Sequence, residues 1–273
     1  MKKDKIVSWL KAITAFMLIT VHIAPFYILI NMSLKSPGER TSRWMPPAKL
    51  HIQNYISAIE MGNLLLAIRN TLIIVAASVV IIVMVGAMAA YPLARKVTKK
   101  NQLILGFIVG IMMVPQLSIL VPLYKEMVSL GGINTYWGVI IVSATFNLPM
   151  AIYMYTNFIG TIPRELDEAA MIDGCSHMQV FFRIIMPSLK AITASVVIWT
   201  SVGIWNDYQF QLYFLQKPSF CTITLAITTF FTETKTDMGA AAAAAFMVVL
   251  PPVILYIMLQ KYFVKGAMDS AVK

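Results

Sequence analysis

Charge is scarce in this sequence of 273 residues, because Asp, Glu, Lys and Arg together make up 12% of it and hydrophobic residues 59%. In a soluble globular domain about a quarter of the residues are charged. The mean hydropathy of +0.75 agrees with this deficit. The composition therefore excludes an ordinary soluble enzyme and places the chain in a membrane.

Motifs that carry enzyme chemistry are also missing. The sequence has no GxxxxGK[ST] phosphate-binding loop, so we expect that the chain does not hydrolyse ATP itself. Its three histidines, His22, His51 and His177, show no HExxH motif and no convergent ligand spacing. These absences predict a chain that is not an enzyme, with no catalytic residues, no metal site and no cofactor of its own.

Cysteine is nearly absent as well. Cys175 and Cys221 have no metal-ligand spacing, and the topology described below puts them on opposite sides of the membrane, so we predict two free thiols. The formal net charge of +10 is compatible with nucleic-acid binding, but the basic residues are not gathered on one patch or helix face. We therefore expect no nucleic-acid partner.

Long apolar runs are abundant, and about 20 residues suffice to cross the hydrocarbon of a bilayer. Six runs cover residues 12–34, 70–94, 101–124, 135–159, 188–215 and 238–260. We therefore predict an all-α polytopic membrane protein, with six transmembrane helices in a single transmembrane domain, residues 1–273. Tyr91 and Pro92 are expected to end the second run. Pro115 and Pro122 interrupt the third, as prolines do at bends of membrane helices.

The segments between the runs predict the topology. Residues 35–69 are expected to form an external loop with one short helix, and residues 216–237 a second outer loop. Lys and Arg in short flanking loops are concentrated in the cytoplasm. The two ends of the chain, the 95–100 loop and residues 161–190 hold 14 of the 22 basic residues. This pattern predicts a multi-pass protein of the cell (inner, cytoplasmic) membrane with both termini cytoplasmic.

Residues 161–187, TIPRELDEAAMIDGCSHMQVFFRIIMP, form a charged island between the fourth and fifth runs. Glu165, Asp167 and Glu168 favour the positive N-terminal end of a helix, so the first half of this island predicts a short surface helix. Both termini of the island adjoin apolar runs, which makes it a candidate docking loop on the cytoplasmic side. A plain amphipathic connector between two membrane helices is the alternative.

The second half of this segment predicts a tight turn and another helix. Gly174 can adopt the left-handed conformation that follows a helix end. Ser176, with Gln179 three residues later, has the spacing of a capping box that starts a second helix. Pro187 closes the unit, because proline is tolerated in the first turn of the next helix.

The spacing inside the segment is Glu-Ala-Ala, three residues, Gly174, nine residues, Ile, one residue, Met186 and Pro. It resembles the EAA loop of the membrane subunits of binding-protein-dependent ABC importers, whose pattern ends in Ile-x-Leu-Pro. Only Met186 departs from that pattern, and Leu to Met is a nearly volume-conserving apolar change. The resemblance implies that a partner ATPase is coupled through Glu168, Ala169, Ala170, Asp173, Gly174, Ile184 and Pro187.

Three further stretches extend the resemblance over essentially the whole chain: WNDYQFQ in the fifth run, TDMGAAAAAA at the start of the sixth, and LQKYFVKG near the end. They resemble the second permease of carbohydrate importers, the maltose and multiple-sugar group, although Met238 stands where tryptophan is common. The resemblance implies a type I ABC importer permease fold in contact with membrane lipid. It also implies a heterodimer with a homologous second permease, two ATP-binding subunits that use ATP and Mg, an extracytoplasmic solute-binding protein and a sugar (oligosaccharide) substrate.

The polar and aromatic cluster of the fifth run has the side chains that a sugar site requires. Aromatic faces pack on the apolar C–H patches of a sugar, while amide and carboxylate groups bind its hydroxyls. Asp207 is the one carboxylate within a predicted span, so it should face the pore or a partner helix. The candidate substrate-pathway residues are Asn147, Trp205, Asn206, Asp207 and Gln209. An aromatic interfacial belt with a polar packing cluster explains the same residues without a substrate.

Two other functions also fit the sequence. The first is a permease for another solute, such as a polyol, glycerol phosphate or peptide. The second is a membrane enzyme or sensor that works without an ATPase. Copurification separates these classes, because only a permease should bring a nucleotide-binding subunit along through residues 161–187.

Overall fold

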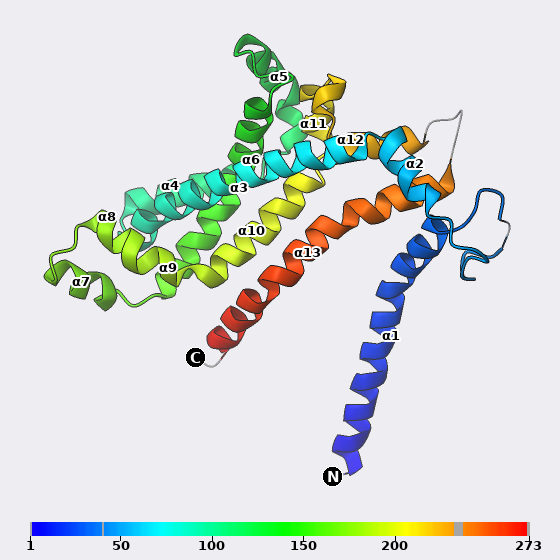
Figure 1. Cartoon of the computed structure of the whole chain (residues 1–273). Helices are drawn as coiled ribbons and strands as arrows, with labels where there is room; N and C mark the ends of the chain where they lie inside the picture. Colours follow the sequence, from blue (N-terminus) through cyan, green and yellow to red (C-terminus); the bar gives the residue numbers. More distant parts are fainter. Residues whose placement is uncertain (1, 40, 232–236, 272–273) are drawn as a thin grey trace. The chain divides into compact units, whose positions relative to one another are not determined.

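A computed structural model describes residues 2–39, 41–231 and 237–271, and the regular elements in this part of the chain are all helical (Figure 1). This agrees with the predicted all-α class. Contacts within the chain group its residues into two compact units. The first holds residues 1–65 and 226–250, and the second holds residues 66–225 and 251–273.

Five helices are long: α1 (Lys2–Ser33), α3 (Leu64–Arg95), α6 (Tyr136–Thr161), α10 (Lys190–Trp205) and α13 (Met238–Ala271). The shorter α-helices are α2 (Gln53–Met61), α4 (Lys99–Ile111), α5 (Leu120–Ser129), α7 (Glu165–Ile172), α8 (His177–Val180), α9 (Met186–Ser188), α11 (Gln209–Phe214) and α12 (Ile223–Thr228). Three short 3-10 segments, η1 (Gln116–Ile119), η3 (Pro218–Phe220) and η4 (Thr229–Phe231), and a π-helical turn, η2 (Phe181–Ile185), complete the described elements.

Four helical stretches are long and apolar enough to cross a membrane: residues 7–33, 64–95, 136–161 and 238–262. Two bent pairs pass the same test together, residues 99–111 with 116–129 at 88° and residues 177–188 with 190–205 at 75°. The protein is therefore multi-pass. The predicted number of six spans is reached when each bent pair counts as one span.

Pro115 explains one of these bends and Pro187 lies in the first turn of α9 as predicted, whereas Pro92 and Pro122 do not act as predicted. Pro115 directly precedes η1, and α4 ends at Ile111, before this proline. The helix ends there because the residue before a proline is disfavoured in the α-helical conformation. Pro122 leaves α5 intact, since it lies in the first turn, where a missing N–H costs no helical bond. The predicted stop at Pro92 is wrong, because α3 continues to Arg95. The helix can continue past Pro92 because the φ angle of proline fits a helix, and less than one further turn, up to Arg95, follows Pro92.

The predicted boundaries fail at three other places. Residues 64–69, expected in the external loop, are the first turns of α3, because Leu64 and Ala67 are fully buried one helical turn apart. Residues 216–237, expected as a loop, contain η3, α12 and η4. The fifth run, expected to be continuous to residue 215, is interrupted between α10 and α11.

In the first unit, Asn54 of α2 fixes the chain that leaves α1. Its side-chain amide is buried and donates to the carbonyl oxygens of Ser33 and Lys35, at 2.9 and 2.8 Å. A Cβ atom on Gly239, at the start of α13, would lie 2.6 Å from the amide nitrogen of Asn54. The absence of a side chain there lets α13 begin directly against α2.

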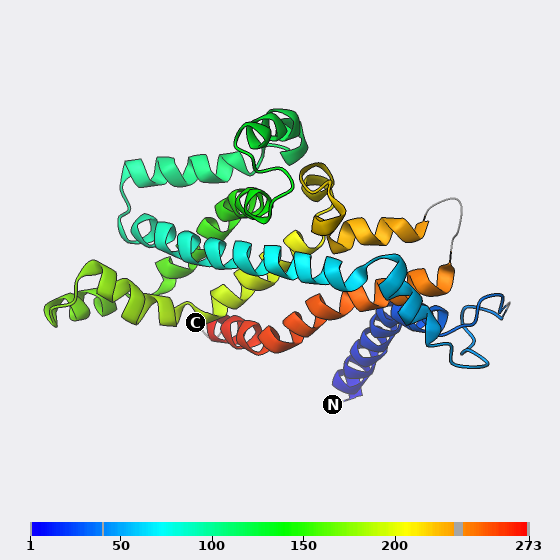
Figure 2. The ribbon, with the colours of Figure 1, turned by 45° about the horizontal axis from the view of Figure 1, so that its top comes forward.

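In the second unit, α6 is the central helix. An added Cβ on Gly86 of α3 would lie 3.3 Å from the Cβ of Ala151, so α3 and α6 approach closely. On the same face of α6, one turn after Ala151, the ring of Tyr155 also lies against Gly86, and its hydroxyl donates to Thr193 of α10 at 3.1 Å. Within this unit, α7 and α8 lie at the end where α3 finishes, while α5 and α11 lie at the opposite end (Figure 2).

Polar side chains of α3 hold the segment that precedes α12. The amide of Asn70 donates to the carbonyl oxygens of Ser219 and Cys221, at 3.0 and 2.8 Å, and it accepts from the hydroxyl of Tyr136 at 2.7 Å. The hydroxyl of the next residue of α3, Thr71, accepts from the N–H of Ile223 at 3.0 Å. Cys221 and Cys175 are both free thiols, as predicted.

Candidate docking loop and cavity

The candidate docking loop, residues 161–187, folds as helix, tight turn and helix, as its sequence predicts. α7 ends before Gly174, whose φ angle of +86° lies in the left-handed region. The N–H of Cys175 donates to the carbonyl of Ala170 at 2.9 Å, and that of Gly174 donates to Met171 at 3.1 Å. These two bonds form a Schellman motif, which satisfies carbonyl groups at the end of α7.

The predicted capping box starts α8. The hydroxyl of Ser176 accepts from the N–H of Gln179 at 3.4 Å, and the side-chain oxygen of Gln179 accepts from the N–H of Ser176 at 2.7 Å. Each side chain therefore satisfies a backbone donor of the other residue. Together with the turn at Gly174, the box fixes the direction in which α8 leaves α7.

Ser176→Ala is expected to destabilise the start of α8 by about 1 kcal/mol, because the N–H of Gln179 loses its acceptor. Amide hydrogen exchange of the purified protein should become faster over residues 177–180. Ser188→Ala is the matched control, since in the described part of the chain the hydroxyl of Ser188 bonds only to the carbonyl of Ile184, one turn earlier. Equal exchange in wild type and Ser176→Ala would contradict the capping role.

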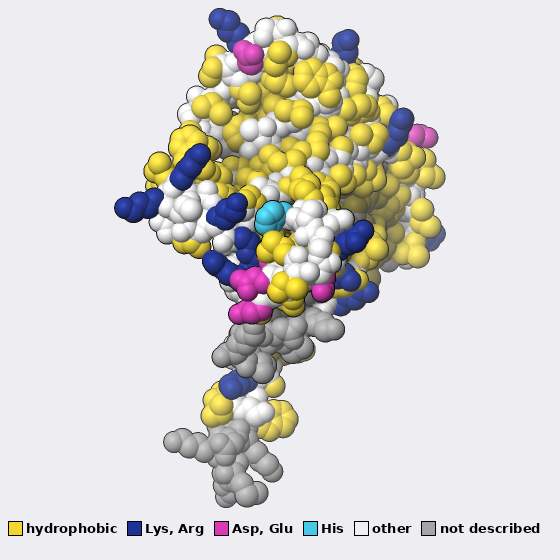
Figure 3. Space-filling view, turned by 90° about the vertical axis from the view of Figure 1, so that its left-hand side faces the viewer, with side chains coloured by type: hydrophobic (Ala, Val, Ile, Leu, Met, Phe, Trp, Pro, Cys, Tyr) yellow, Lys and Arg dark blue, Asp and Glu magenta, His cyan; other side chains and the backbone are white. Residues whose placement is uncertain are grey.

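The residues implied in coupling by the EAA resemblance differ in exposure. Glu168, Ala169, Asp173, Gly174 and Pro187 are exposed, Ile184 is half-buried, and Ala170 is buried. Figure 3 views the end of the second unit that carries α7 and α8, where acidic side chains gather beside Lys and Arg side chains. The loop thus presents a mixed-charge surface that another subunit could contact.

An ion pair that the sequence did not indicate anchors α7. The side chain of Asp167 is 8% exposed and that of Arg95, at the end of α3, is 11% exposed. The guanidinium donates to both carboxylate oxygens, from Nε at 2.8 Å and from Nη2 at 3.0 Å. The hydroxyl of Tyr91 donates to Oδ2 of the same carboxylate at 2.9 Å. Asp167 therefore acts through this pair, and not only through the favourable N-terminal position that its sequence predicts.

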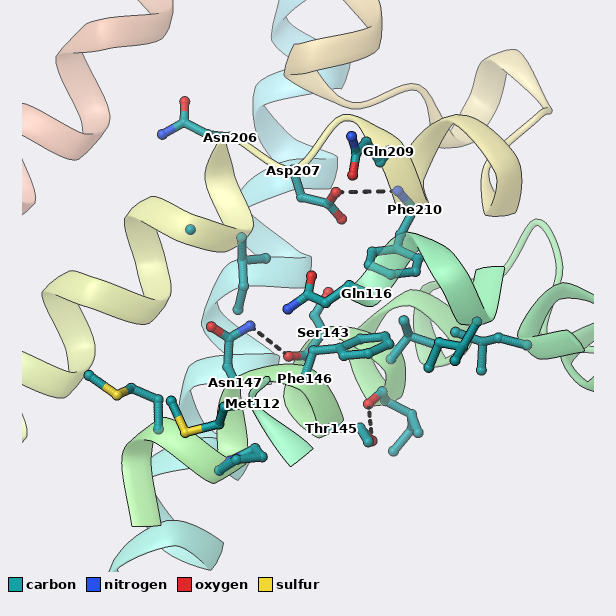
Figure 4. Close-up of a pocket in the computed structure, with 18 of the residues that line it drawn as sticks. Met112, Gln116, Ser143, Thr145, Phe146, Asn147, Asn206, Asp207, Gln209 and Phe210 are labelled. Atoms are coloured by element: carbon teal, nitrogen blue, oxygen red, sulfur yellow. Dashed lines mark hydrogen bonds between the residues drawn. The ribbon is translucent and has the colours of Figure 1, made fainter. Parts of the chain in front are cut away.

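A cavity of about 1220 Å³ lies at the opposite end of the same unit (Figure 4). Its polar lining consists of Gln116, Ser143, Thr145, Asn147, Asn206, Asp207, Tyr208 and Gln209, and its aromatic lining includes Phe146, Trp199 and Phe210. The rings of Phe146 and Phe210 stack with centroids 4.8 Å apart. In Figure 4 the carboxyl group of Asp207 points toward Gln116, and Asn147 lies farther along the cavity.

Asp207 lies in the break after α10, which corrects its predicted place inside a continuous span. α10 ends at Trp205, and Oδ1 of Asp207 accepts from the N–H of Phe210 at 3.3 Å, in the first turn of α11. The backbone oxygen of Asp207 accepts from the hydroxyl of Thr224 at 2.9 Å. The break brings a half-buried carboxylate to the wall of the cavity.

Comparison with known proteins shows to which family a chain with this loop and these helices belongs. Residues 82–268 match the family described as "Binding-protein-dependent transport system inner membrane component". The chain belongs to this family. It is 41% identical over 273 residues to the "Melibiose/raffinose/stachyose import permease protein MelC" of Bacillus subtilis (strain 168), covering 100% of this chain and 98% of MelC.

Two further comparisons agree with this inner membrane component family. The "Probable starch degradation products transport system permease protein AmyC" of Thermoanaerobacterium thermosulfurigenes is 31% identical over 274 residues, covering 100% of both chains. One solved structure, of "a bacterial ABC transporter involved in the import of the acidic polysaccharide alginate", matches with a TM-score of 0.83 at 18% identity. That match covers 96% of this chain and 98% of the other, and it shows the fold. The chain is thus a transport component and not an enzyme.

In this inner membrane component, four of the five predicted pathway residues line one cavity: Asn147, Asn206, Asp207 and Gln209. Trp205 is not among the lining residues, and its side chain is 4% exposed. Gln116 and Trp199 also line the cavity but are not among the residues predicted from the sequence. Gln116 follows Pro115, so a polar residue next to a helix-breaking proline was the available signal. Trp199 had no such signal, because its place on α10 depends on how that helix packs.

Proposed function

We propose that this chain is a permease subunit of an ATP-driven, binding-protein-dependent importer of neutral oligosaccharides. It forms half of the translocation pore with a homologous second permease, and the whole chain, residues 1–273, acts as one transmembrane domain. Two ATP-binding subunits that use ATP and Mg dock on residues 161–187, and a solute-binding protein delivers the sugar from outside. The chain lies in the cell (inner) membrane, among its lipids, with both termini and the docking loop cytoplasmic and residues 35–69 external.

The observation that carries the sugar proposal is the full-length similarity, at 41% identity, to a permease named for melibiose, raffinose and stachyose. The cavity supports the same substrate class. Its amide and carboxylate groups can bind hydroxyls, and the exposed faces of Trp199 and Tyr208 can pack on the C–H patches of a sugar. Asn147, Asn206, Asp207 and Gln209 would then contribute to the substrate pathway.

The charge of the cavity favours a neutral substrate over an acidic one. Among the described residues that line it there is no Lys, Arg or His, and Asp207 is the sole carboxylate. An anionic saccharide would be repelled there by the like charge of Asp207 and would find no cation to pair with. This repulsion would disfavour its binding relative to that of a neutral sugar. We therefore expect the importer to discriminate against uronic acids.

Reconstituted vesicles that hold the complete importer provide the test. With the cognate solute-binding protein present, ATP should drive uptake of raffinose and should leave an alginate oligosaccharide outside. Comparable uptake of both sugars would contradict the neutral-substrate proposal. Uptake of glycerol phosphate or of a peptide in place of either sugar would assign the permease to another solute.

The docking proposal makes a separate prediction for Glu168, which is exposed on α7. Glu168→Lys should weaken ATPase association while the membrane helices still insert, because it reverses one charge on the docking surface. The measurement is the amount of ATPase that copurifies with the permease. Glu60→Lys is the matched control, since Glu60 is an exposed residue of α2 in the segment that we propose to be external. Equal recovery of ATPase with Glu168→Lys and Glu60→Lys would contradict the docking role and favour the alternative, in which residues 161–187 only connect two membrane helices.

A further inference from the structure

Arg95 joins three elements of the second unit. Besides its two bonds to Asp167 of α7, its Nη1 donates to the carbonyl oxygens of Ile159 and Ile162, at 3.1 and 2.8 Å. These carbonyls belong to the last turn of α6 and to the residue that follows it. A single guanidinium at the end of α3 therefore holds the end of α6 and the first helix of the docking loop.

The covalent chain provides only part of this connection. Residues 162–164 link α6 to α7 without helical structure, and the turn at Gly174 links α7 to α8. By contrast, Arg95 at the end of α3 lies 72 residues before Asp167 in the chain. The ion pair is thus a direct mechanical connection between α7 and α3 that the backbone does not supply.

The chemistry of the contact makes it stiff. A guanidinium and a carboxylate in a two-bond fork have one favoured relative orientation, unlike a single point contact. The hydroxyl of Tyr91, one helical turn before Arg95, donates to the same carboxylate and restrains it further. Both charged side chains are largely buried, so water competes for these bonds less than it does at an exposed ion pair.

We propose that Arg95 is a positioning residue, which makes α7 move as one body with the ends of α3 and α6. A pull of the ATPase on the docking loop would then reach two membrane helices directly, in addition to α10, which follows the loop in the chain. This inference rests on the proposed function, because it assigns a path to the motion that the ATPase drives.

The first test measures one distance in the unmodified contact. Spin labels are placed at Val97 and Ile172, which are 64% and 86% exposed, in the complete importer after Cys175→Ser and Cys221→Ser. The distribution of distances between the labels should be narrow and equal in the nucleotide-free and ATP-bound complexes. A distance that changes between these two states would overturn the proposal, and this measurement needs no variant of Arg95.

The second test breaks the contact. Asp167→Asn and Arg95→Lys keep the approximate size of the side chain but lose the charged fork, so the label distances should broaden. Sugar taken up per ATP hydrolysed should fall about tenfold, within the usual range of coupling effects. Tyr91→Phe, which removes one bond from the carboxylate, should have a smaller effect of the same kind. Lys96→Gln is the matched control, since Lys96 is the exposed neighbour of Arg95.

The outcomes separate the two proposals. If the importer with the unmodified contact copurifies with ATPase and takes up sugar, but Asp167→Asn leaves the distances and the uptake per ATP unchanged, the positioning role is wrong. If that importer neither holds an ATPase nor takes up sugar, the proposed function itself is wrong. If the distribution of label distances stayed narrow in Asp167→Asn, the positioning role would be overturned even if uptake were lost. In that case α7 would keep its place relative to the end of α3 without the ion pair.

Discussion

Gly174→Val is expected to abolish ATP-driven uptake while the permease still inserts and assembles. The φ angle of Gly174 is +86°, and an L residue pays roughly 1–2 kcal/mol in the left-handed region. For valine the cost is larger, because a β-branched side chain is a clear outlier there. The loop would relieve this strain by changing the turn, which would break the Schellman bonds and misdirect α8.

The surroundings of Gly174 make this a test of backbone conformation alone. Apart from the atoms of Gly174 and its two neighbours in the chain, no heavy atom would lie within 4 Å of an added Cβ. A steric clash with other parts of the fold therefore does not contribute to the effect of the substitution. Gly174→Asn should keep most of the uptake, because asparagine adopts the left-handed conformation at lower cost. Gly160→Val is the matched control, since Gly160 in α6 has equally open surroundings and no positive φ.

These variants are compared as purified complexes, by ATP hydrolysis with and without the liganded binding protein and by uptake in vesicles. Stimulated hydrolysis and uptake should be lost in Gly174→Val only. Full activity of Gly174→Val would show that coupling does not require the direction of α8, and it would remove the support for a docking role of residues 161–187.

Asp207→Leu is expected to reduce sugar uptake by at least about tenfold, equivalent to about 1.4 kcal/mol, with assembly intact. The carboxylate is the sole anionic group among the described residues that line the cavity, and it can accept two hydroxyl hydrogen bonds. Leucine removes both the charge and the acceptors. Asp207→Asn should lose less uptake, because it keeps one acceptor oxygen for the N–H of Phe210.

Uptake per assembled complex, with ATPase copurification as the measure of assembly, distinguishes the roles of Asp207. If the Leu and Asn variants both transport at the wild-type rate, Asp207 serves the break between α10 and α11 and not the substrate. If both variants fail equally, the charge itself is required.

Local patterns in the sequence predict the fold of residues 161–187, the candidate docking loop, well. The turn at Gly174 and the capping box of Ser176 and Gln179 depend on residues within a few positions of each other, so spacing is enough to find them. The long helices were equally predictable from the sequence, because an apolar run of about 20 residues has few alternative structures. Their ends were not, as α3 shows by continuing through Pro92 to Arg95.

Features that depend on residues far apart in the chain were not predictable in the same way. Arg95 was assigned to a basic loop and Asp167 to the favourable end of a helix, and nothing in their spacing pairs them. The cavity is predictable in part, since its residues near Asp207 are adjacent in sequence, whereas Gln116 comes from η1 and Trp199 lies earlier in α10. Trp205 is next to Asn206 in sequence but is buried away from the cavity lining, because consecutive residues of a helix face different directions.

The hydrogen bonds that hold residues 219–224 limit how a gate could work on this side of the bundle. Asn70 and Thr71 fix the backbone of this segment to α3, and Thr224 fixes it in turn to the backbone of Asp207. The segment is therefore fixed to α3 and to the break after α10, and it is not a lid that lifts by itself. In the proposed importer, a solute that passes Asp207 would be admitted by helices that part as rigid groups, and residues 219–224 would travel with them.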